Sequence, residues 1–341
     1  MGSDLEIGGL KVALGTRERG SLRIGPYWLH PREYIRHYLL MPFTVVRGAK
    51  DGPMLVQTAG CHPTEYAGID ATIRLSNVVD PKELKGTFVA VPCVNVAGFF
   101  ERTYVNPIDG KNIQGLYPGR ADGTISEMMA YTLFNEIVSK ANYHIDCHGG
   151  CLNESELWSF IYYGTNDDTE RKSEEIAKAS GMKYFWYSVY HGSLGMEAAK
   201  RGIPSGAYEL NSMGRLFPEE SSAIVEGTLN VMRHLGMLSG QPKPIKGQPG
   251  TTDDQEAEAY CVAGANYFTK SGLYHTNVKP GDHLKQGEIV GTVSDFSGEV
   301  LETIRAPATG IVLWKIDSPV ALPGDTAVVV HTKGKSTLSA T

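Results

Sequence analysis

This chain of 341 residues is predicted to form an α/β domain, in which helices cover both faces of a central sheet, followed by a small all-β domain. As far as residue 238, apolar segments of strand length alternate with segments of helical periodicity, which is typical of such a sheet. After a proline-rich stretch, the pattern changes to short strands separated by glycine turns. Ligands of α/β sheets bind at the carboxyl ends of the strands, so polar residues that follow predicted strands are the first candidates for a functional site.

The elements of the first domain are predicted in order from periodicity, caps and breakers. Its strands are expected at residues 54–59, 87–94, 143–147, 158–163 and 205–210. Its helices are expected at residues 66–79, 126–139, 170–179, 194–200 and 219–238. Pro81 stops the first helix, and Thr124 or Ser126 is the expected N-cap of the second. Glu219 and Glu220 fall in the first turn of the last helix, where the helix dipole favours acidic side chains.

Charge and composition exclude several classes of function. The net charge of -6 provides no basic surface for nucleic acid or an anionic membrane, so neither is expected as a partner. A run of about 18 apolar residues, which a membrane span requires, does not occur in the sequence. The N-terminal sequence lacks the regions of a secretion signal, and the five cysteines are an odd number, so a cytoplasmic protein with reduced thiols is expected. Cys147 and Cys151 flank His148, but no second such pair completes a structural zinc site.

Three polar residues stand where a metal site is expected. His62 and Glu65 follow the strand at 54–59 and open a helix, and their spacing puts both on one side of a helical turn. His148 follows the strand at 143–147. Two histidines and one carboxylate, with a fourth position open, are the ligand set of a catalytic zinc ion and suit a borderline divalent metal. HxxE alone is a weak motif, and the order of strands, helices and polar loop around it strengthens the prediction.

A hydrolytic zinc site also needs a proton carrier and a stabiliser of the oxyanion. Zinc lowers the pKa of a bound water to about 7, and a nearby carboxylate then takes the proton and passes it to the leaving amine. Glu209, in the strand at 205–210, is the candidate for this base. Residues 96–124 are predicted to form a long polar loop, and such loops usually line functional sites. Arg102 in this loop is the candidate cation for the oxyanion.

Two further residues lie on the strand that precedes His148. Asp146 is two residues before it and shares its strand face, so Asp146 is expected to support the metal site from behind. His144 shares the same face by the same count, and it is expected to be a buried, hydrogen-bonded histidine rather than a ligand.

Five segments, taken in order, resemble the succinylglutamate desuccinylase/aspartoacylase family of the zinc carboxypeptidase-like superfamily. They are GCHPTEYAG at 60–68, NVAGFFERTYVNPIDGKN at 95–112, YPGRADGT at 117–124, IDCHGG at 145–150 and GIPSGAYELN at 202–211. The resemblance implies a mixed central sheet flanked by helices and one zinc ion per chain, held by His62, Glu65 and His148. It further implies that Glu209 is the general base and that Arg102 polarises the scissile carbonyl.

The sequence departs from the family pattern in the substrate-binding segment. Asn112 falls in the family's DGKNxNR-like segment, but Gln114 and Gly115 stand where the family usually has Asn-Arg. The missing arginine would clamp a substrate carboxylate through a bidentate pair. Either Arg120 or Arg215 replaces it, or the substrate lacks a carboxylate in the usual place. The candidate substrate-binding residues are Asn112, Gln114, Arg120 and His191.

Residues 241–254 contain three prolines and no apolar periodicity, which predicts a domain boundary. The expected domains are residues 1–245, a catalytic domain with an N-terminal β segment, and residues 250–341, an all-β domain. The second resembles the lipoyl/biotinyl-like barrel-sandwich domain, but its hairpin at 294–298 contains no lysine, so a carrier role is not expected. By resemblance to family members it caps the active site or forms an oligomer contact, and a homo-oligomer is left open.

The sequence therefore predicts a zinc-dependent amidohydrolase that removes an acyl group from an N-acyl amino acid or a related small metabolite. A zinc carboxypeptidase acting on short peptides is one alternative, but the loss of Asn-Arg disfavours it because a carboxypeptidase must hold the terminal carboxylate. The other alternative is a metal-binding or ligand-binding protein without turnover. It is disfavoured because the three ligand positions, the base position and Arg102 all hold competent residues.

Overall fold

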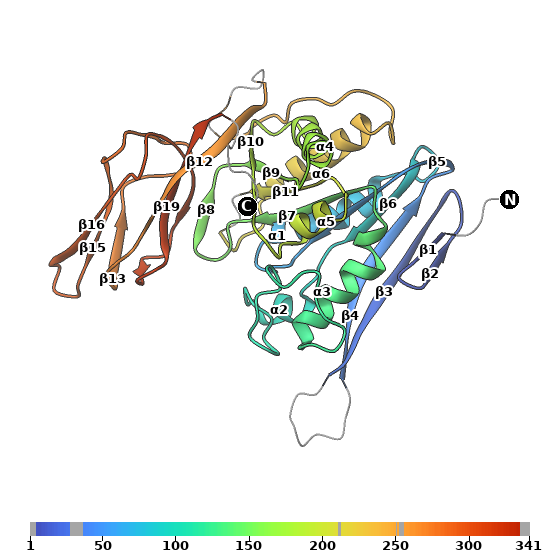
Figure 1. Cartoon of the computed structure of the whole chain (residues 1–341), viewed down its shortest axis with the longest axis horizontal. Helices are drawn as coiled ribbons and strands as arrows, with labels where there is room; N and C mark the ends of the chain where they lie inside the picture. The colour runs from blue at the N-terminus through green and yellow to red at the C-terminus, as the bar shows by residue number, and fades with distance from the viewer. Residues whose placement is uncertain (1–4, 28–36, 211–212, 250, 252–255, 335–341) are drawn as a thin grey trace.

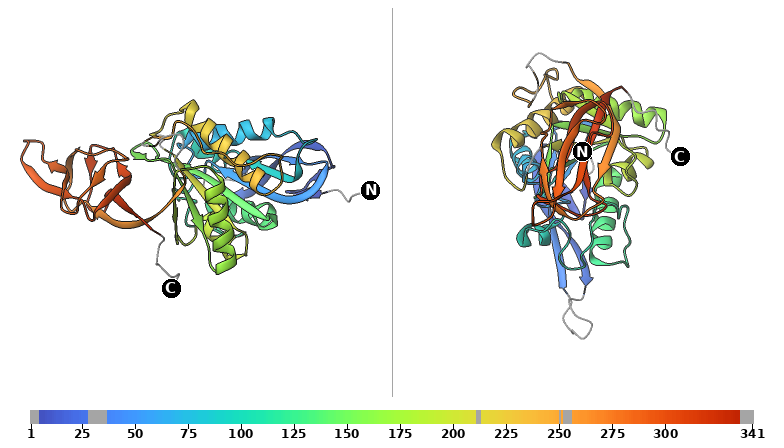
Figure 2. Two further views of the ribbon diagram at one scale, coloured as in Figure 1. Left: turned by 90° about the horizontal axis from the view of Figure 1, so that it is seen from above. Right: turned by 90° about the vertical axis from the view of Figure 1, so that its left-hand side faces the viewer.

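A mixed sheet of 13 strands runs through the molecule, and helices cover its central part (Figure 1). The structure is a computed structural model that describes residues 5–27, 37–210, 213–249, 251 and 256–334. The N-terminal strands lie at one end of the long axis and the C-terminal strands at the other (Figure 2). The predicted class, an α/β fold with a mixed central sheet and a C-terminal group of strands, is confirmed.

Parallel strands form the middle of the sheet. The strand β5 (Lys50–Ala59) pairs in parallel with β6 (Lys85–Val91) on one side and with β7 (Tyr143–Gly149) on the other. On the far side of β7 lies β11 (Ser205–Leu210), also parallel, and β9 (Ser159–Tyr163) pairs antiparallel with β11. The carboxyl ends of β5, β7 and β11 therefore meet at one edge of the sheet, which is where ligands of such sheets bind.

Helices pack on both faces of this sheet, as predicted. On one face, side chains such as Leu55 and Phe88 form a core with three helices. On the other face, the neighbouring residues Val56 and Val89 belong to a second core, because successive side chains of a strand point to opposite faces. The first core includes α1 (Tyr66–Val78), α4 (Asp167–Ala179) and α6 (Pro218–His234), and the second includes α3 (Ile125–Glu136) and α5 (Leu194–Lys200).

The N-terminal segment adds antiparallel strands. The long strands β3 (Thr16–Tyr27) and β4 (His37–Arg47) form a ladder, and β4 continues the main sheet beside β6. A separate two-stranded sheet consists of β1 (Leu5–Ile7) and β2 (Leu10–Val12). Among the described residues, none of the helices combines the length and the apolar character that crossing a membrane demands.

Several predicted elements differ from the structure. Residues 96–101 were expected in a loop but form α2 (Val96–Glu101), which is capped by the Asn95 side chain. This helix is too short to show helical periodicity in the sequence. The predicted helix 126–139 ends at Glu136 and is followed by the 3₁₀ turn η1 (Val138–Lys140). The strands β8 (Glu154–Glu156) and β10 (Tyr184–Tyr187) were not predicted. Both are short, and they pair with the strands of residues 310–316 and 258–267, which are distant in sequence.

The C-terminal strands continue the main sheet. The strand β12 (Glu258–Tyr267) pairs in parallel with β10, and β17 (Gly310–Ile316) pairs antiparallel with β8. The strand β19 (Thr326–Lys333) lies between β12 and β17. The remaining strands are β14 (His283–Leu284), which pairs with β17, and the four-stranded sheet of β13 (Gly272–Thr276), β15 (Ile289–Ser294), β16 (Val300–Arg305) and β18 (Val320–Ala321).

The predicted domain boundary between residues 245 and 250 stays a prediction. Residues 250 and 252–255 of the expected linker lie outside the described residues. On either side of them, the pairing of β10 with β12 joins the two halves of the chain through backbone hydrogen bonds.

A buried carboxyl group in α6 makes stability depend on pH. Glu220 lies in the first turn of α6, as predicted, and is 3% exposed. Burial and the neighbouring Glu219 raise the pKa of Glu220 to about 8, from 4.5 for an ordinary glutamate. Between these two values the folded protein binds a proton that the unfolded chain releases, so stability falls as the pH rises from about 4.5 to about 8.

We therefore expect Glu220→Gln to raise Tm at pH 8.5 by about 4 °C, equivalent to about 2 kcal/mol, and to leave Tm unchanged near pH 4. Thermal unfolding followed by circular dichroism at both pH values tests this. The matched control is Glu83→Gln, because Glu83 is exposed, is not among the groups that raise the pKa of Glu220, and its replacement is expected to change stability by less than about 0.5 kcal/mol. Equal Tm values for wild type and Glu220→Gln at pH 8.5 would contradict the assignment of a buried, protonated carboxyl.

Candidate active site

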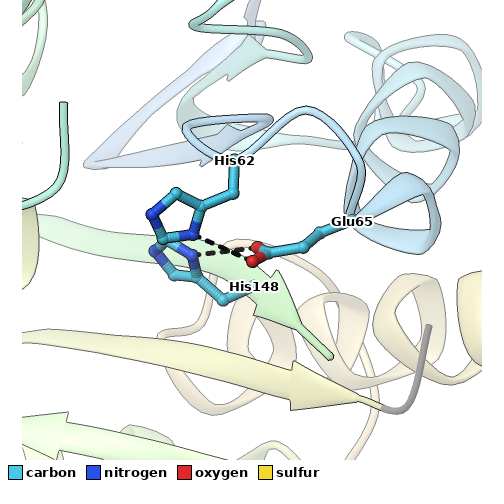
Figure 3. Close-up of side chains that lie close together, drawn as sticks. All are labelled: His62, Glu65 and His148. Atoms are coloured by element: carbon cyan, nitrogen blue, oxygen red, sulfur yellow. Dashed lines mark hydrogen bonds and ion pairs between the residues drawn. The ribbon is translucent and has the colours of Figure 1, made fainter. Parts of the chain in front are cut away.

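His62, Glu65 and His148 converge at the carboxyl edge of the sheet (Figure 3). Each offers one ligand atom, and these atoms all lie within 4.8 Å of one another. Glu65 is the residue that precedes α1, His62 lies in the turn between β5 and α1, and His148 lies near the end of β7. All three are buried, so the group is a compact cluster of donor atoms inside the protein.

A glycine makes the turn after β5 possible. Gly60 follows the last residue of β5 and has a φ of +66°, which side chains other than glycine rarely adopt. A Cβ atom at this position would also lie 3.1 Å from the Cα atom of Cys93. The chain therefore turns sharply at Gly60 and brings His62 back toward the end of β7, where His148 lies.

The two histidines present the same ring nitrogen to the same carboxylate. His62 Nδ1 lies 2.8 Å from Glu65 Oε1, and His148 Nδ1 lies 3.1 Å from Glu65 Oε2. The opposite nitrogens have partners of their own: His62 Nε2 lies 3.0 Å from Asn112 Oδ1, and His148 Nε2 lies 3.0 Å from Asp146 Oδ2. An acceptor at each Nε2 favours a proton there, which leaves each Nδ1 free to bind a metal. The donor set and its surroundings therefore fit a divalent cation.

The carboxylates around His148 favour a positive charge in this cluster. Burial opposes the charged imidazole, but Asp146 and Glu65 outweigh it and raise the pKa of His148 well above its usual value. Burial likewise opposes the carboxylate of Glu65, but the two histidines outweigh it and lower its pKa. A proton on His148 thus balances two buried carboxylates, and a metal ion at the same place would balance them as well.

Asp146 lies behind His148, as predicted, and is itself held in place. Thr58 Oγ1 donates a hydrogen bond to Asp146 Oδ1 at 2.6 Å. His144 is buried, with its ring nitrogens 3.0 Å from Thr58 Oγ1 and 2.8 Å from Ser205 Oγ. Burial lowers the pKa of His144 to about 4, so its ring is neutral at physiological pH. The prediction of a buried, hydrogen-bonded histidine is confirmed.

Glu209 lies beside the three candidate ligands. In the ladder between β11 and β7, Glu209 is the direct partner of His148. Both residues line a cavity of about 280 Å³ together with His62 and Glu65. Burial raises the pKa of the Glu209 carboxyl to about 8, and Glu65 adds to this effect while His148 opposes it. The structure therefore places the Glu209 carboxyl group in the same cavity as the three candidate metal ligands.

A family model described as the succinylglutamate desuccinylase/aspartoacylase catalytic domain matches residues 51–235, which is more than half of the chain. The chain belongs to this family. The match contains His62, Glu65, His148 and Glu209.

Individual relatives in the succinylglutamate desuccinylase/aspartoacylase family cover nearly the whole chain. An N-alpha-acetyl-L-2,4-diaminobutyric acid deacetylase of Halomonas elongata is 27% identical over 302 residues, or 86% of this chain and 85% of that protein. The crystal structure of a succinylglutamate desuccinylase/aspartoacylase from Rhodobacter sphaeroides has a TM-score of 0.84 at 24% identity, covering 95% of this chain and 98% of that one. The product-bound structure of the ectoine utilization protein EutE (DoeB) from Ruegeria pomeroyi has a TM-score of 0.83 at 22% identity, covering 94% of this chain and 97% of that one.

Two of the candidate substrate-binding residues of this family member line the cavity. Asn112 and Gln114 both do so, and Gln114 Oε1 is buried without a hydrogen-bond partner among the described residues. Several other lining residues, which include two acidic and several aromatic side chains, were not predicted from the sequence. The residues that complete the lining are Tyr104, Gly149, Glu154, Glu156, Ile161, Tyr163, Trp186, Ser188 and Tyr190.

The remaining candidates are exposed and do not belong to the described lining of this cavity. Arg102 ends α2 with a left-handed φ of 56°. Arg120 pairs with Asp122 at 3.3 Å, and Arg215 lies over the ring of Phe217. The exposed residues are Arg102, Arg120, His191 and Arg215. Roles for these side chains in catalysis or substrate binding stay predictions and require them to turn toward the cavity.

The C-terminal strands reach the candidate active site. A second cavity, of about 700 Å³, shares Glu156, Trp186 and Glu209 with the first and continues along β12, β17 and β19. The Trp314 side chain, from β17, donates a hydrogen bond to Glu154. The predicted position of the C-terminal strands beside the active site agrees with these contacts.

Proposed function

We propose that this chain is a zinc-dependent amidohydrolase that removes the acyl group from an N-acyl amino acid or a related small metabolite. One observation carries the proposal: the donor atoms of His62, Glu65 and His148 converge beside the Glu209 carboxyl in one cavity. Membership of a deacylase family supports it. A relative named as an N-alpha-acetyl-L-2,4-diaminobutyric acid deacetylase supports an N-acyl amino acid as the class of substrate.

Each residue of the cluster has a proposed role. His62, Glu65 and His148 would hold one zinc ion, which when bound lowers the pKa of a coordinated water to about 7 and provides the nucleophile. The Glu209 carboxylate accepts a proton from the attacking water and delivers it to the nitrogen of the leaving amine. Asn112 and Asp146 hold the two imidazole rings through their Nε2 atoms. The products are a carboxylate and an amine.

Arg102 is the proposed cation for the oxyanion of the tetrahedral intermediate. Its position at the end of α2 places it in the segment that also carries Asn112 and Gln114 to the cavity. Because the side chain is exposed, this role requires it to swing inward when substrate binds.

The lining of the cavity disfavours a carboxypeptidase. An enzyme that removes a C-terminal residue must hold the terminal carboxylate, usually through an arginine. Among its described lining residues the cavity has neither lysine nor arginine, and Gln114 and Gly115 stand where the family usually has Asn-Arg. A binding protein without turnover is the second alternative, and the carboxyl group of Glu209 beside the ligands argues for turnover instead.

The test is to incubate zinc-loaded protein with a panel of N-acetyl amino acids and with unblocked dipeptides and tripeptides. Acetate and primary amine are measured separately. We expect equimolar acetate and free amino acid from at least one N-acetyl substrate and no hydrolysis of the peptides. Release of C-terminal residues from peptides would support the carboxypeptidase, and zinc binding without turnover on either panel would support the binding protein.

A further inference from the structure

His331 is a buried histidine whose ring nitrogens have no hydrogen-bond partner. It lies on β19 and is 2% exposed, and neither Nδ1 nor Nε2 bonds to any of the described residues. Burial lowers the pKa of His331 to about 4, so the ring is neutral and offers one N–H donor and one acceptor. Buried polar atoms are nearly always hydrogen-bonded, because losing contact with water is costly. The ring therefore points to a ligand with a polar atom at this place.

This histidine faces the cavity of about 700 Å³ that the C-terminal strands help to form. Alternate residues of a strand share a face, so Val329 and His331 line the cavity, whereas Val328 and Val330 belong to the core of the C-terminal strands. The imidazole ring packs edge-on against Trp186, with the ring centroids 5.2 Å apart. Because Trp186 also lines the smaller cavity that contains the candidate metal ligands, the polar ring lies close to that cavity.

The two cavities are continuous, and the larger one is mostly apolar. The residues that line both are Glu156, Ile161, Trp186, Tyr190 and Glu209. Beyond these, the larger cavity is lined mainly by apolar and aromatic side chains, namely Val262, Ala265, Tyr267, Leu313, Trp314 and Val329. Its described lining contains no lysine or arginine. A ligand that extends from the metal cluster past Glu209 therefore meets apolar surface and one neutral imidazole.

This lining suits the acyl half of an N-acyl amino acid better than the amine half. The amine half carries a carboxylate, and in the larger cavity that charge would meet Glu156 and Glu209 without a cationic partner in the described lining, which is costly. An apolar acyl chain gains free energy from burial in the same place. A two-carbon acetyl group would leave most of the space unused, since a cavity of this volume is in the range that holds whole ligands.

We propose that the larger cavity is an acyl-chain subsite, which takes an apolar acyl chain of several carbons bearing a hydroxyl or carbonyl oxygen that bonds to His331. The proposal rests on the proposed deacylase function, because it assigns the acyl half of that substrate. The scissile amide lies at the metal cluster, and the chain runs past Glu209 and Trp186 toward β12 and β19. His331 is a binding residue for the chain and takes no part in moving the proton.

The first test places the same atoms on either half of the substrate. N-hexanoylglycine and N-acetyl-L-norleucine are isomers that differ in whether the four extra carbons extend from the acyl group or from the amine. Binding is measured by calorimetry on zinc-loaded Glu209→Gln protein, in which the compounds are expected to stay intact. We expect N-hexanoylglycine to bind about 30-fold more tightly than N-acetylglycine and about 10-fold more tightly than its isomer. Tighter binding of N-acetyl-L-norleucine than of N-hexanoylglycine would overturn the assignment.

A substitution that fills the cavity tests the location of the chain. Ala265 lines the cavity from β12, so Ala265→Phe is expected to reduce the preference for N-hexanoylglycine over N-acetylglycine by about 10-fold or more. The matched control is Ala263→Phe, because Ala263 is exposed on the same strand and is not part of the described lining. An unchanged preference in folded Ala265→Phe protein would place the chain elsewhere and overturn the subsite.

The role of His331 is tested with hydroxyl groups along the chain. His331→Phe keeps a ring against Trp186 and removes both polar nitrogens, so it is expected to fold at least as stably as the wild type. Among N-hexanoylglycines with a hydroxyl on carbon 4, 5 or 6, at least one is expected to bind the His331 protein about 5-fold more tightly than plain N-hexanoylglycine does. His331→Phe is expected to remove this gain. A series in which no compound depends on His331 would overturn the hydrogen bond.

Turnover by the wild type separates the subsite from the deacylase function. We expect kcat/KM for N-hexanoylglycine to exceed that for N-acetylglycine by about 30-fold, mainly through KM. Selective binding to Glu209→Gln without hydrolysis of any compound by the wild type would overturn the deacylase function and keep the subsite. Hydrolysis of both compounds with equal kcat/KM would overturn the subsite and keep the deacylase function.

Discussion

A Glu209→Gln variant is expected to bind zinc as the wild type does and to hydrolyse N-acyl substrates about 1,000-fold more slowly. Glu209 is not one of the three clustered residues His62, Glu65 and His148, so its loss leaves the donor atoms in place. The amide of glutamine has the same shape but cannot accept the proton of the attacking water or return it to the leaving amine. The expected effect is therefore on kcat, with metal content unchanged.

The measurement is steady-state kinetics and elemental analysis on the same samples. Folding is not expected to suffer, because burial already disfavours the charged form of Glu209 and a neutral amide is compatible with that environment. Glu83→Gln is a matched control, since Glu83 is exposed in the turn before β6. A Glu209→Gln variant that retained more than about a tenth of the wild-type kcat would show that another group moves the proton.

A His148→Ala variant is expected to lose both bound metal and activity. His148 Nδ1 supplies one of the three clustered donor atoms, and two remaining donors hold zinc far more weakly than three. The substitution also removes one of the partners of Glu65 and one of the partners of Asp146. Metal content is expected to fall from about one equivalent to less than about 0.1, with no measurable hydrolysis.

Elemental analysis after gel filtration measures this loss, and thermal unfolding establishes that the variant is folded. The matched control is His234→Ala, because His234 is exposed in the last turn of α6 and is not part of the cluster. A folded His148→Ala protein that kept one equivalent of zinc would contradict the proposed ligand set. Wild-type protein without metal, even after zinc is supplied, would contradict the metal-dependent mechanism itself.

The elements that support the metal cluster could be predicted because their signals are local. The apolar run before Gly60, the turn and the helical periodicity after it place His62 and Glu65 at a helix start. The spacing of Asp146 and His148 puts both on one face of their strand, whatever the rest of the fold does. Thr124, one of the two expected N-caps, is the N-cap of α3, and its backbone N–H donates a hydrogen bond to the Glu127 carboxylate.

The arginine positions show the limit of such local reasoning. Arg102 and Arg120 occur in segments that resemble the family's substrate-binding region, and both are exposed outside the described cavity lining. The direction of a long side chain at the end of a short helix or in a turn depends on packing and solvent, which a motif does not report. No local pattern distinguishes an arginine that enters a cavity from one that extends into water.

Hydrophobic periodicity, caps and motif spacing act between near neighbours, so the fold class, the family and the three residues of the candidate metal site could be predicted from the amino-acid sequence. The groups that surround this candidate site depend instead on how distant segments pack. Asn112 meets His62 across 50 positions of sequence, and β8 brings Glu154 and Glu156 to the cavity by pairing with β17 far along the chain. These contacts depend on strand register and on the packing of distant segments, so the acidic lining of the cavity appears only when the chain is folded.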